Sequence, residues 1–409
     1  MAEQMQWANA LSTRPSLEAA ITDVVEQAVS SLTVPADLAV IFISSAFASE
    51  YSRVLPLLAE KLSVPVIIGC SGLGVIGTTA TGEPLELEGE PAISLTLGYL
   101  PGVNVEVFHV LGEELPDMDS SPDAWIDLIG VQPSPTPQFI LLSSAFSSRI
   151  NDLLQGLDFA YPGSVIVGGQ ASSGGGSSQI SLFCSHDAQG IHQRLYREGT
   201  VGLALSGNIV LETIVAQGCR PIGQPMQVTK AERNIILELD QKVPLMVLRD
   251  LIASLSEEER ILAQRSLFVG LVMDQFKLSL QQGDFLIRSI LGVDPSGGAI
   301  AIGDVIRPGQ RLQFQLRDAQ ASAEDLELLL EGYQKQQIFP PAAAFMFSCL
   351  GRGQGLYGQS NFDSELFSRY IHHIPIGGFF CNGEIGPVGG NTFVHGYTSV
   401  FAICRPMIS

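Results

Sequence analysis

Basic side chains are scarce in this sequence of 409 residues. It contains 22 Lys and Arg against 42 Asp and Glu, which gives a formal net charge of −20. Nucleic acids and anionic membrane surfaces are bound through clusters of Lys and Arg, and the sequence contains no such cluster. We therefore expect neither nucleic acid nor an anionic membrane as a partner.

Segments that would direct the chain into or across a membrane are also missing. The first residues, Met1–Trp7, have no positively charged region followed by an apolar one, and so do not resemble a secretory signal. No apolar run approaches the roughly 20 residues that a membrane-spanning helix needs. These absences predict a cytoplasmic protein that does not insert into a membrane.

Cysteine is infrequent and scattered, and no two cysteines form a C-x-x-C pair. The six cysteines are Cys70, Cys184, Cys219, Cys349, Cys381 and Cys404. Without a secretory signal, this pattern favours reduced thiols over a disulfide framework. Because H-E-x-x-H and paired-cysteine motifs are absent as well, we expect no metal site.

One glycine motif matches a cofactor fingerprint by spacing alone. Gly72-x-Gly74-x-x-Gly77 has the spacing of the dinucleotide motif, whose last glycine must open a helix. Here Thr78–Pro84 follows, and its composition predicts a turn and extended chain. The phosphate-binding motif G-x-x-x-x-G-K-[ST] does not occur at all. The sequence therefore predicts no cofactor.

Apolar residues make up 46% of the chain and charged residues 16%, which is typical of a folded protein with a large core. The length allows two domains. Residues 1–37 are expected to form an N-terminal helical segment, because apolar residues recur there at helical spacing. These residues are Leu17, Ala20, Ile21, Val24, Val25, Ala28, Val29 and Leu32.

An internal repeat organises the next part of the chain. A strand (Leu38–Ser44), a helix (Ser49–Leu62) and a second strand that runs into glycines predict one unit, which extends over 38–110. The same pattern returns 99 residues later, over 138–217, so we infer a duplication. A more degenerate third copy begins at Phe345 and returns to the glycine pattern at Gly378.

The best candidate boundary between two halves is Pro221–Gln227. We expect one domain over 38–225 and a second over 226–409. The expected fold class is α+β or mixed α/β, with two related halves of mixed β-sheets covered by helices. Both halves would be built from repeated β-α-β-glycine-loop-β-hairpin units.

The stretch Ile374–Pro387 holds the main candidate site. Glu384 is the only acidic residue after Glu365, and it lies among glycines and apolar side chains, where a carboxylate needs a partner. Arg352, which lies between two glycines, has the planar guanidinium that suits a carboxylate. Two interpretations stay open, a structural Arg352–Glu384 salt bridge or a ligand site that uses both charges.

Other residues extend this candidate site. Glycines near strand ends allow a ligand to approach the backbone closely, and we expect the glycine loops of the copies to converge on the ligand. Candidate ligand-binding residues in the third copy are Arg352, Gly378, Cys381, Asn382, Gly383, Glu384 and His395. Those in the first two copies are Gly69, Ser71, Gly168, Gly169 and Gln170.

A thiol-dependent enzyme is the alternative. Cys381 or Cys349 could serve as the nucleophile with His395 as the base, but a buried cysteine is usually an inert apolar residue. The sequence does not decide whether these thiols are reactive. It favours a binding protein over an enzyme.

Several of these motifs resemble the FIST family (F-box and intracellular signal transduction proteins). Cys349-x-Gly-Arg-Gly, the stretch Pro375–Pro387 with F-F-C-N-G-E-I-G, and His395-Gly-Tyr-Thr resemble the C-terminal FIST domain. The glycine strands that end in Gly69-Cys-Ser and Gly168-Gly resemble the N-terminal FIST domain. The resemblance covers roughly Leu38 to Cys404.

The resemblance implies a sensory module that binds small ligands such as amino acids. Family members are often fused to signalling domains, for which this chain has no room, so we expect a stand-alone sensor that signals through a separate protein. Arg352 could hold the carboxylate of an amino-acid-like ligand and Glu384 its ammonium. Val75 takes the place of Glu384 in the first copy, which puts an acidic site there in doubt. A scaffold without a ligand is a further alternative, and the ligand, the partner and the oligomeric state stay open.

Overall fold

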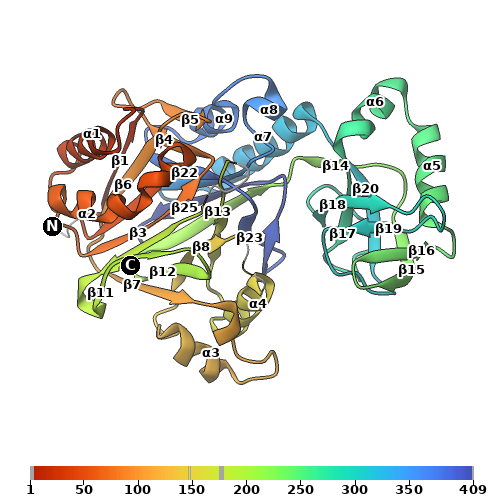
Figure 1. Cartoon of the computed structure of the whole chain (residues 1–409), viewed down its shortest axis with the longest axis horizontal. Helices are drawn as coiled ribbons and strands as arrows, with labels where there is room; N and C mark the ends of the chain where they lie inside the picture. The colour runs from red at the N-terminus through yellow and green to blue at the C-terminus, as the bar shows by residue number, and fades with distance from the viewer. Residues whose placement is uncertain (1–3, 146, 148, 175–178, 408–409) are drawn as a thin grey trace. The chain divides into compact units, whose positions relative to one another are not determined.

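Runs of Val, Ile, Leu and Phe form the central strands of the sheets in this computed structural model, which describes residues 4–145, 147, 149–174 and 179–407. Contacts divide the chain into two units (Figure 1). The first consists of Met1–Val215, Leu329–Val394 and Thr398–Ser409, and the second of Ala216–Leu328 and His395–Tyr397. Residues of the expected second half, 226–409, therefore occur in both units. The mixed α+β fold class is confirmed.

The described strands of the first unit form three six-stranded sheets. The first sheet has the order β1 (Gln6–Ser12), β6 (Ile93–Tyr99), β2 (Leu38–Ser44), β3 (Val66–Gly72), β10 (Leu182–His186) and β11 (Ile191–Tyr196). The second has the order β24 (Asn391–His395), β23 (Glu384–Val388), β9 (Ile166–Ala171), β8 (Gln138–Ser144), β12 (Thr200–Gly207) and β7 (Val103–Val110). The third has the order β13 (Val210–Ala216), β25 (Ser399–Arg405), β21 (Ala343–Cys349), β22 (Ile376–Cys381), β4 (Gly74–Thr78) and β5 (Pro84–Glu88).

Each of these three sheets is centred on one parallel strand pair: β2 with β3, β8 with β9, and β21 with β22. After the second strand of each pair, the chain crosses to another sheet. β4 follows β3 and pairs with β22, β23 follows β22 and pairs with β9, and β10 follows β9 and pairs with β3. The ends of β3, β9 and β22 are thereby brought together. The duplication inferred from the sequence stays a prediction, and residues 146, 148 and 175–178 of its second copy lie outside the described residues.

A shared core fills the space between the three sheets. One cluster of buried apolar side chains takes members from all of them. At its centre, the Phe42 ring stacks on Phe379 with centroids 5.0 Å apart, and Phe347 meets Phe379 edge-on at 5.9 Å. Phe42 belongs to the first sheet, whereas Phe347 and Phe379 are neighbours within the third. Because aromatic side chains bury large apolar areas, the Phe42–Phe379 contact holds the first and third sheets against each other.

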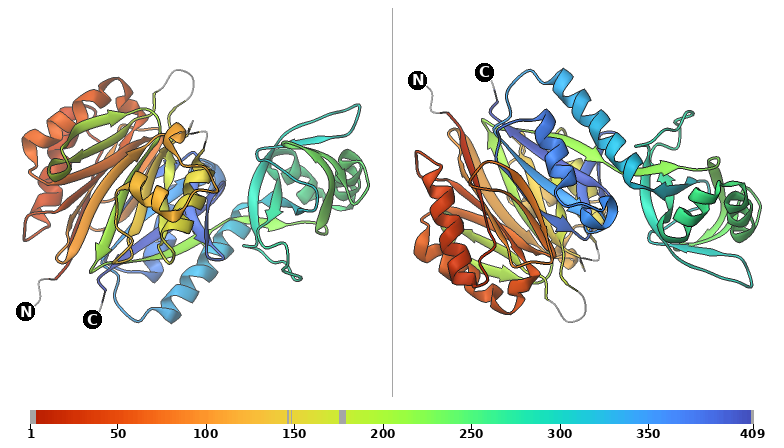
Figure 2. Two further views of the ribbon diagram at one scale, coloured as in Figure 1. Left: turned by 90° about the horizontal axis from the view of Figure 1, so that it is seen from below. Right: turned by 90° about the horizontal axis from the view of Figure 1, so that it is seen from above.

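Helices cover the outer faces of the sheets (Figure 2). α1 (Leu17–Ser30) and α2 (Tyr51–Lys61) pack on the first sheet, and α3 (Pro122–Ile129) and α4 (Ile150–Ala160) on the second. The third copy contributes α8 (Gln354–Tyr357) and α9 (Phe362–Tyr370), and α7 (Ala319–Gln336) precedes it. Short 3₁₀ turns occur at Ser45–Glu50, Gly112–Glu114 and Asp187–Gln189.

The N-terminal segment differs in part from the expected helix. The apolar residues predicted to face the core do so in α1, which Ser16 caps by accepting a hydrogen bond from the Ala19 N–H at 3.3 Å. Two of them differ, because 47% of the surface of Val29 is exposed, and Leu32 lies beyond the end of α1 and is only partly buried. The structure also adds β1, which pairs antiparallel with β6.

The second unit contains a seven-stranded sheet. Its order is β14 (Cys219–Pro221), β20 (Arg311–Arg317), β15 (Met226–Glu232), β16 (Ile235–Leu239), β19 (Ile300–Ile302), β18 (Phe285–Val293) and β17 (Leu267–Val272). β17 also pairs with β20, which closes the sheet into a ring around an apolar core. α5 (Pro244–Ser254) and α6 (Glu257–Ser266) belong to this unit. Among all described residues, no helix is long and apolar enough to cross a membrane.

Candidate functional site

The predicted glycine loops lie within strands. Gly69 belongs to β3, Gly168 to β9 and Gly378 to β22. A Cβ atom on these glycines would lie 2.1, 1.9 and 1.9 Å, respectively, from the backbone carbonyl oxygen of a residue in the neighbouring strand. The carbonyl groups belong to Ile41, Leu141 and Met346. The sheets themselves therefore require glycine at these positions, whether or not a ligand binds there.

The strand ends do converge, and Ser172 links them. Its hydroxyl accepts the Leu73 N–H at 2.8 Å, just beyond β3, and donates to the carbonyl of Phe380 in β22. Its own N–H donates to the carbonyl of Ser71 at 3.3 Å. Ser71 Oγ in turn accepts the Ser181 N–H at 3.0 Å. Ser172 is 3% exposed, and nothing in its Ser- and Gly-rich surroundings distinguishes it in the sequence.

Candidate residues of the second and third copies lie side by side. The Gln170 N–H donates to the Gly383 carbonyl at 2.8 Å, and the Asn382 N–H donates to the Gln170 carbonyl at 3.0 Å. A Cβ on Gly169 would lie 2.3 Å from Cys381 Sγ, and one on Gly383 would lie 2.5 Å from the Gln170 side chain. The Asn382 side chain itself is exposed. β9 and the β22–β23 connection thus approach each other as closely as glycine allows.

Glu384 begins β23 and has no exposed surface. Its Oε2 accepts the Thr398 N–H at 3.2 Å, while Oε1 has no hydrogen-bond partner in the described part of the chain. Burial raises the pKa of Glu384 well above its ordinary value. The Thr398 N–H, the Arg352 charge and the Cys349 thiol lower the pKa by less than burial raises it. Glu384 therefore keeps its proton at pH values at which an exposed glutamate is ionised.

Arg352 is equally buried, and its ion pair is with Asp363 in α9. Nε donates to Oδ2 at 2.6 Å and Nη2 donates to Oδ1 at 2.9 Å, so the pair is bidentate. The Tyr357 hydroxyl accepts a second bond from Nη2 at 2.6 Å and donates to Asp363 Oδ1 at 2.8 Å. The partner expected from the sequence was Glu384. Arg352 lies near enough to lower the pKa of Glu384, but it forms its bidentate ion pair with Asp363.

Two carboxyl groups of β5 hold the segment around Arg352. Glu86, 3% exposed, accepts the Ser364 N–H at 2.7 Å in the first turn of α9. Glu88 accepts the Gln354 N–H at 2.8 Å at the start of α8. Burial, with the nearby charge of Asp363, raises the pKa of Glu86 to about 8. Neither glutamate stands out in the sequence, because β5 lies 278 positions before Ser364.

The candidate thiols have the properties of buried, unreactive cysteines. Cys381 has no exposed surface, and burial raises the pKa of its thiol well above the ordinary value. Cys349 is 8% exposed and its Sγ accepts the Gly351 N–H at 3.4 Å. His395 is buried, and its contacts group it with Tyr397 in the second unit. No group of His, Cys, Asp and Glu among the described residues could hold a metal ion.

Comparison with known proteins identifies the same family that the sequence motifs resemble. The FIST N domain matches residues 37–242 and the FIST C domain matches residues 244–387. An uncharacterized protein of Mycobacterium tuberculosis is 33% identical over 395 residues, which cover 96% of this chain and 98% of that protein. An F-box/LRR-repeat protein of Arabidopsis thaliana is 23% identical over 76% of this chain and 67% of its own length. Human F-box only protein 22 is 35% identical over a stretch of 75 residues, 14% of this chain and 19% of that protein.

These matches cover nearly the whole chain, and they include the buried Glu384 and the residues around it. The chain belongs to the FIST family, whose domains are associated with sensing in signal transduction.

Proposed function

We propose that this protein is a sensor for a small molecule that carries an amine, and that Glu384 receives the ammonium group of that ligand. The proposal rests on one observation, the fully buried carboxyl whose Oε1 has no partner among the described residues. Leaving a buried polar atom unpaired costs about 1–3 kcal/mol. Such atoms are rare in folded proteins, and a binding role is one reason to retain them.

The charges near Glu384 favour a cationic group. Arg352 is already neutralised by Asp363, and burial favours the protonated form of Glu384 by raising its pKa. An ammonium group at Oε1 would favour the ionised carboxylate, so Glu384 would lose its proton as the ligand binds. An amino-acid-like ligand fits this site at its amine end. Because Asp363 and Tyr357 occupy Nε and Nη2 of Arg352, we assign the carboxylate end to other donors, such as the exposed amide of Asn382.

Entry of a ligand requires movement, since Glu384 has no exposed surface. The segment that carries Arg352 is suited to it. The backbone has positive φ angles at Gly353 (61°), Gly358 (70°) and Asn361 (63°), and its N–H groups donate hydrogen bonds to Glu86 and Glu88, which hold it closed. Glycines and asparagine adopt such angles at low cost, so a few residues can absorb the change.

Proton release tests the proposal. A thermal-shift screen against amino acids and other small amines should yield a ligand that stabilises the protein by about 2.7 kcal/mol at 100 times its Kd. Calorimetric titration of that ligand in buffers of different ionisation enthalpy should then show protons released on binding. Glu384→Gln imitates the protonated side chain and should fold but lose binding. The control Glu365→Gln changes an exposed glutamate of α9 and should bind normally.

Binding that persists in Glu384→Gln, or that releases no proton at neutral pH, would overturn this assignment. We do not propose the thiol-dependent reaction, because reactive cysteines have lowered pKa values and burial raises that of Cys381.

Signalling through a separate protein is part of the proposal, and a loop of the second unit supports it. Phe276 and Leu278 are 92% and 96% exposed. The loop is nevertheless well held, because Arg311 Nη2 donates to the carbonyl groups of Asp274, Gln275 and Lys277 at 3.1, 2.7 and 2.7 Å. Apolar side chains presented on a fixed loop are typical contacts with a protein partner. A photo-crosslinking residue at position 276 should capture a defined partner, and one at the exposed Ser254 of α5, outside this loop, should not.

A further inference from the structure

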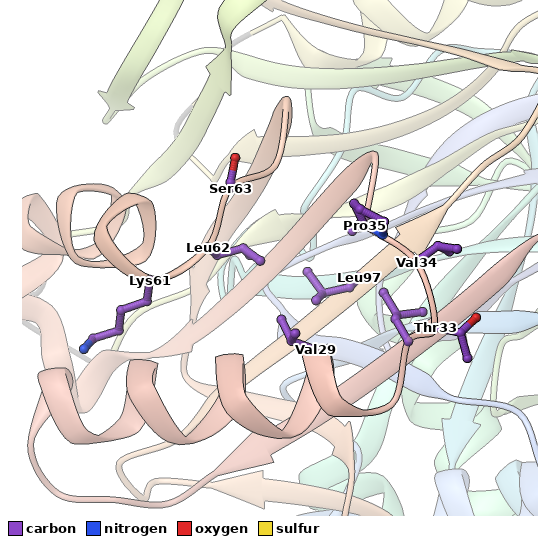
Figure 3. Close-up of a pocket in the computed structure, with 10 residues that line it drawn as sticks. Val29, Thr33, Val34, Pro35, Lys61, Leu62, Ser63 and Leu97 are labelled. Carbon is purple, nitrogen blue, oxygen red and sulfur yellow. The ribbon is translucent and has the colours of Figure 1, made fainter.

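A second candidate binding site lies away from Glu384, between the C-terminal ends of α1 and α2. A pocket of about 430 Å³ opens there beside β6, within the first unit (Figure 3). Its volume is in the range of small-molecule sites, and seven of its ten lining residues are apolar. Figure 3 shows Val29, Val34, Leu62 and Leu97 around the centre of the pocket.

The walls combine buried and exposed apolar surface. Leu97 is fully buried and Leu62 is 8% exposed, whereas Val29 is 47% exposed although its spacing in α1 matches the core-facing residues. The exposed side of Val29 faces this pocket. An apolar ligand would cover it and would complete the burial that the helical pattern predicts.

Lys61 is the only charged residue of the lining. It lies in the last turn of α2 and forms no ion pair among the described residues, although acidic residues outnumber basic ones in the chain. At the neighbouring end of α1, two backbone N–H groups already donate within the helix and so do not compete with Lys61 for a carboxylate. The Ser31 N–H donates to the Ala28 carbonyl and the Leu32 N–H to the Val29 carbonyl, both at 3.2 Å. The Lys61 side chain extends away from the centre of the pocket (Figure 3), and a change of rotamer would bring its ammonium group to the mouth.

We propose that this pocket binds a small amphipathic carboxylate, with its apolar chain or ring against Val29, Leu62 and Leu97 and its carboxylate at Lys61. The flexible side chain of Lys61 can reach over the mouth of the pocket, which suits a ligand with one charged end. This site is independent of the proposed role of Glu384.

Titration with octanoate, octanol and octylamine tests both halves of the assignment. In calorimetry, octanoate should bind one to one, octanol more weakly and octylamine least. Lys61→Ala should weaken octanoate binding about two- to fivefold, the range for an exposed ion pair, and leave octanol binding unchanged. Val29→Glu places a negative charge near the octanoate carboxylate and removes an apolar side chain from the pocket wall. It should weaken octanoate binding more than tenfold.

Two controls separate this site from other effects. Lys335→Ala removes another exposed lysine in the last turn of a helix, α7, and should bind octanoate as the unmodified protein does. Glu384→Gln should also bind octanoate normally. Octylamine binding as tight as that of octanoate, or octanoate affinity unaffected by both Lys61→Ala and a correctly folded Val29→Glu, would overturn the proposal, as would no octanoate binding at millimolar concentration.

Discussion

Arg352 and Asp363 form a fully buried, bidentate ion pair, with 2.6 Å between Nε and Oδ2 and 2.9 Å between Nη2 and Oδ1. Eleven positions separate the two residues. Tyr357 contacts both, and its ring centroid lies 5.6 Å from the Arg352 guanidinium carbon. Arg352 is therefore buried close to Glu384 because it binds Asp363 and Tyr357, and it stabilises the α8–α9 segment.

Arg352→Ala should destabilise the protein severely, because it leaves Asp363 as an uncompensated buried charge. Loss of one member of a buried pair costs about 3–5 kcal/mol. Urea unfolding followed by circular dichroism measures the change. The double variant Arg352→Met/Asp363→Leu should recover much of the loss, since both charges are then removed. A loss below about 1 kcal/mol in Arg352→Ala would contradict the structural role of the pair.

Stability should fall as the pH rises from about 5 to 8. The pKa of Glu86 is about 8 in the folded protein and near its ordinary 4.5 in the unfolded chain, so the folded state binds more protons between these values. Its stabilising contribution is fully present below pH 4.5 and is lost as the pH passes through 8. The raised pKa of Glu384 acts in the same direction. The slope contributed by each group is at most about 1.4 kcal/mol per pH unit.

Glu86→Gln should flatten this dependence, because glutamine cannot ionise. We expect the variant to be more stable than the unmodified protein at pH 8 and similar to it at pH 5, measured by urea unfolding at both values. Glu365→Gln, at an exposed position, serves as the control and should keep the original slope. A slope unchanged in Glu86→Gln would show that Glu86 is ionised throughout.

Gly378→Ala should prevent stable folding or cost about 3 kcal/mol or more, because the new Cβ would lie 1.9 Å from the carbonyl oxygen of Met346. Gly355→Ala is the matched control, since nothing lies within 4 Å of its Cβ position. Its effect on the free energy of unfolding should stay within about 0.5 kcal/mol. Normal stability of Gly378→Ala would mean that β21 and β22 are further apart than described.

The cysteines should react slowly with iodoacetamide in the folded protein. All six are buried, and burial raises the pKa values of Cys70, Cys184, Cys381 and Cys404. Mass spectrometry after a short exposure at pH 7.5 should find little modification, and denatured protein should be labelled at all six positions. Rapid, selective labelling of Cys381 would instead favour a catalytic thiol.

Local features of the fold were accessible from the sequence. The strand predicted over Leu38–Ser44 is β2 with the same bounds, and the helix predicted over Ser49–Leu62 agrees with α2 (Tyr51–Lys61) to within two residues. Both follow from short-range patterns of apolar residues, which are visible along the chain. The sequence predicts loops at Gly69, Gly168 and Gly378, which lie within strands, because it does not reveal that a neighbouring backbone approaches there.

The amino-acid sequence by itself therefore determined the family, the mixed α+β class and the presence of a carboxyl group at Glu384 that would need a partner in an apolar setting. Only the tertiary structure decided which groups surround that carboxyl. Asp363 rather than Glu384 takes the two-pronged bond of Arg352, and Glu86 reaches Ser364 across 278 positions. The contact of Glu86 with Ser364 depends on β4 and β5 joining the third sheet beside β22, and no pattern of nearby residues encodes that pairing. The Arg352–Asp363 pair lies within one segment, but it depends on how α8 and α9 fold back on each other.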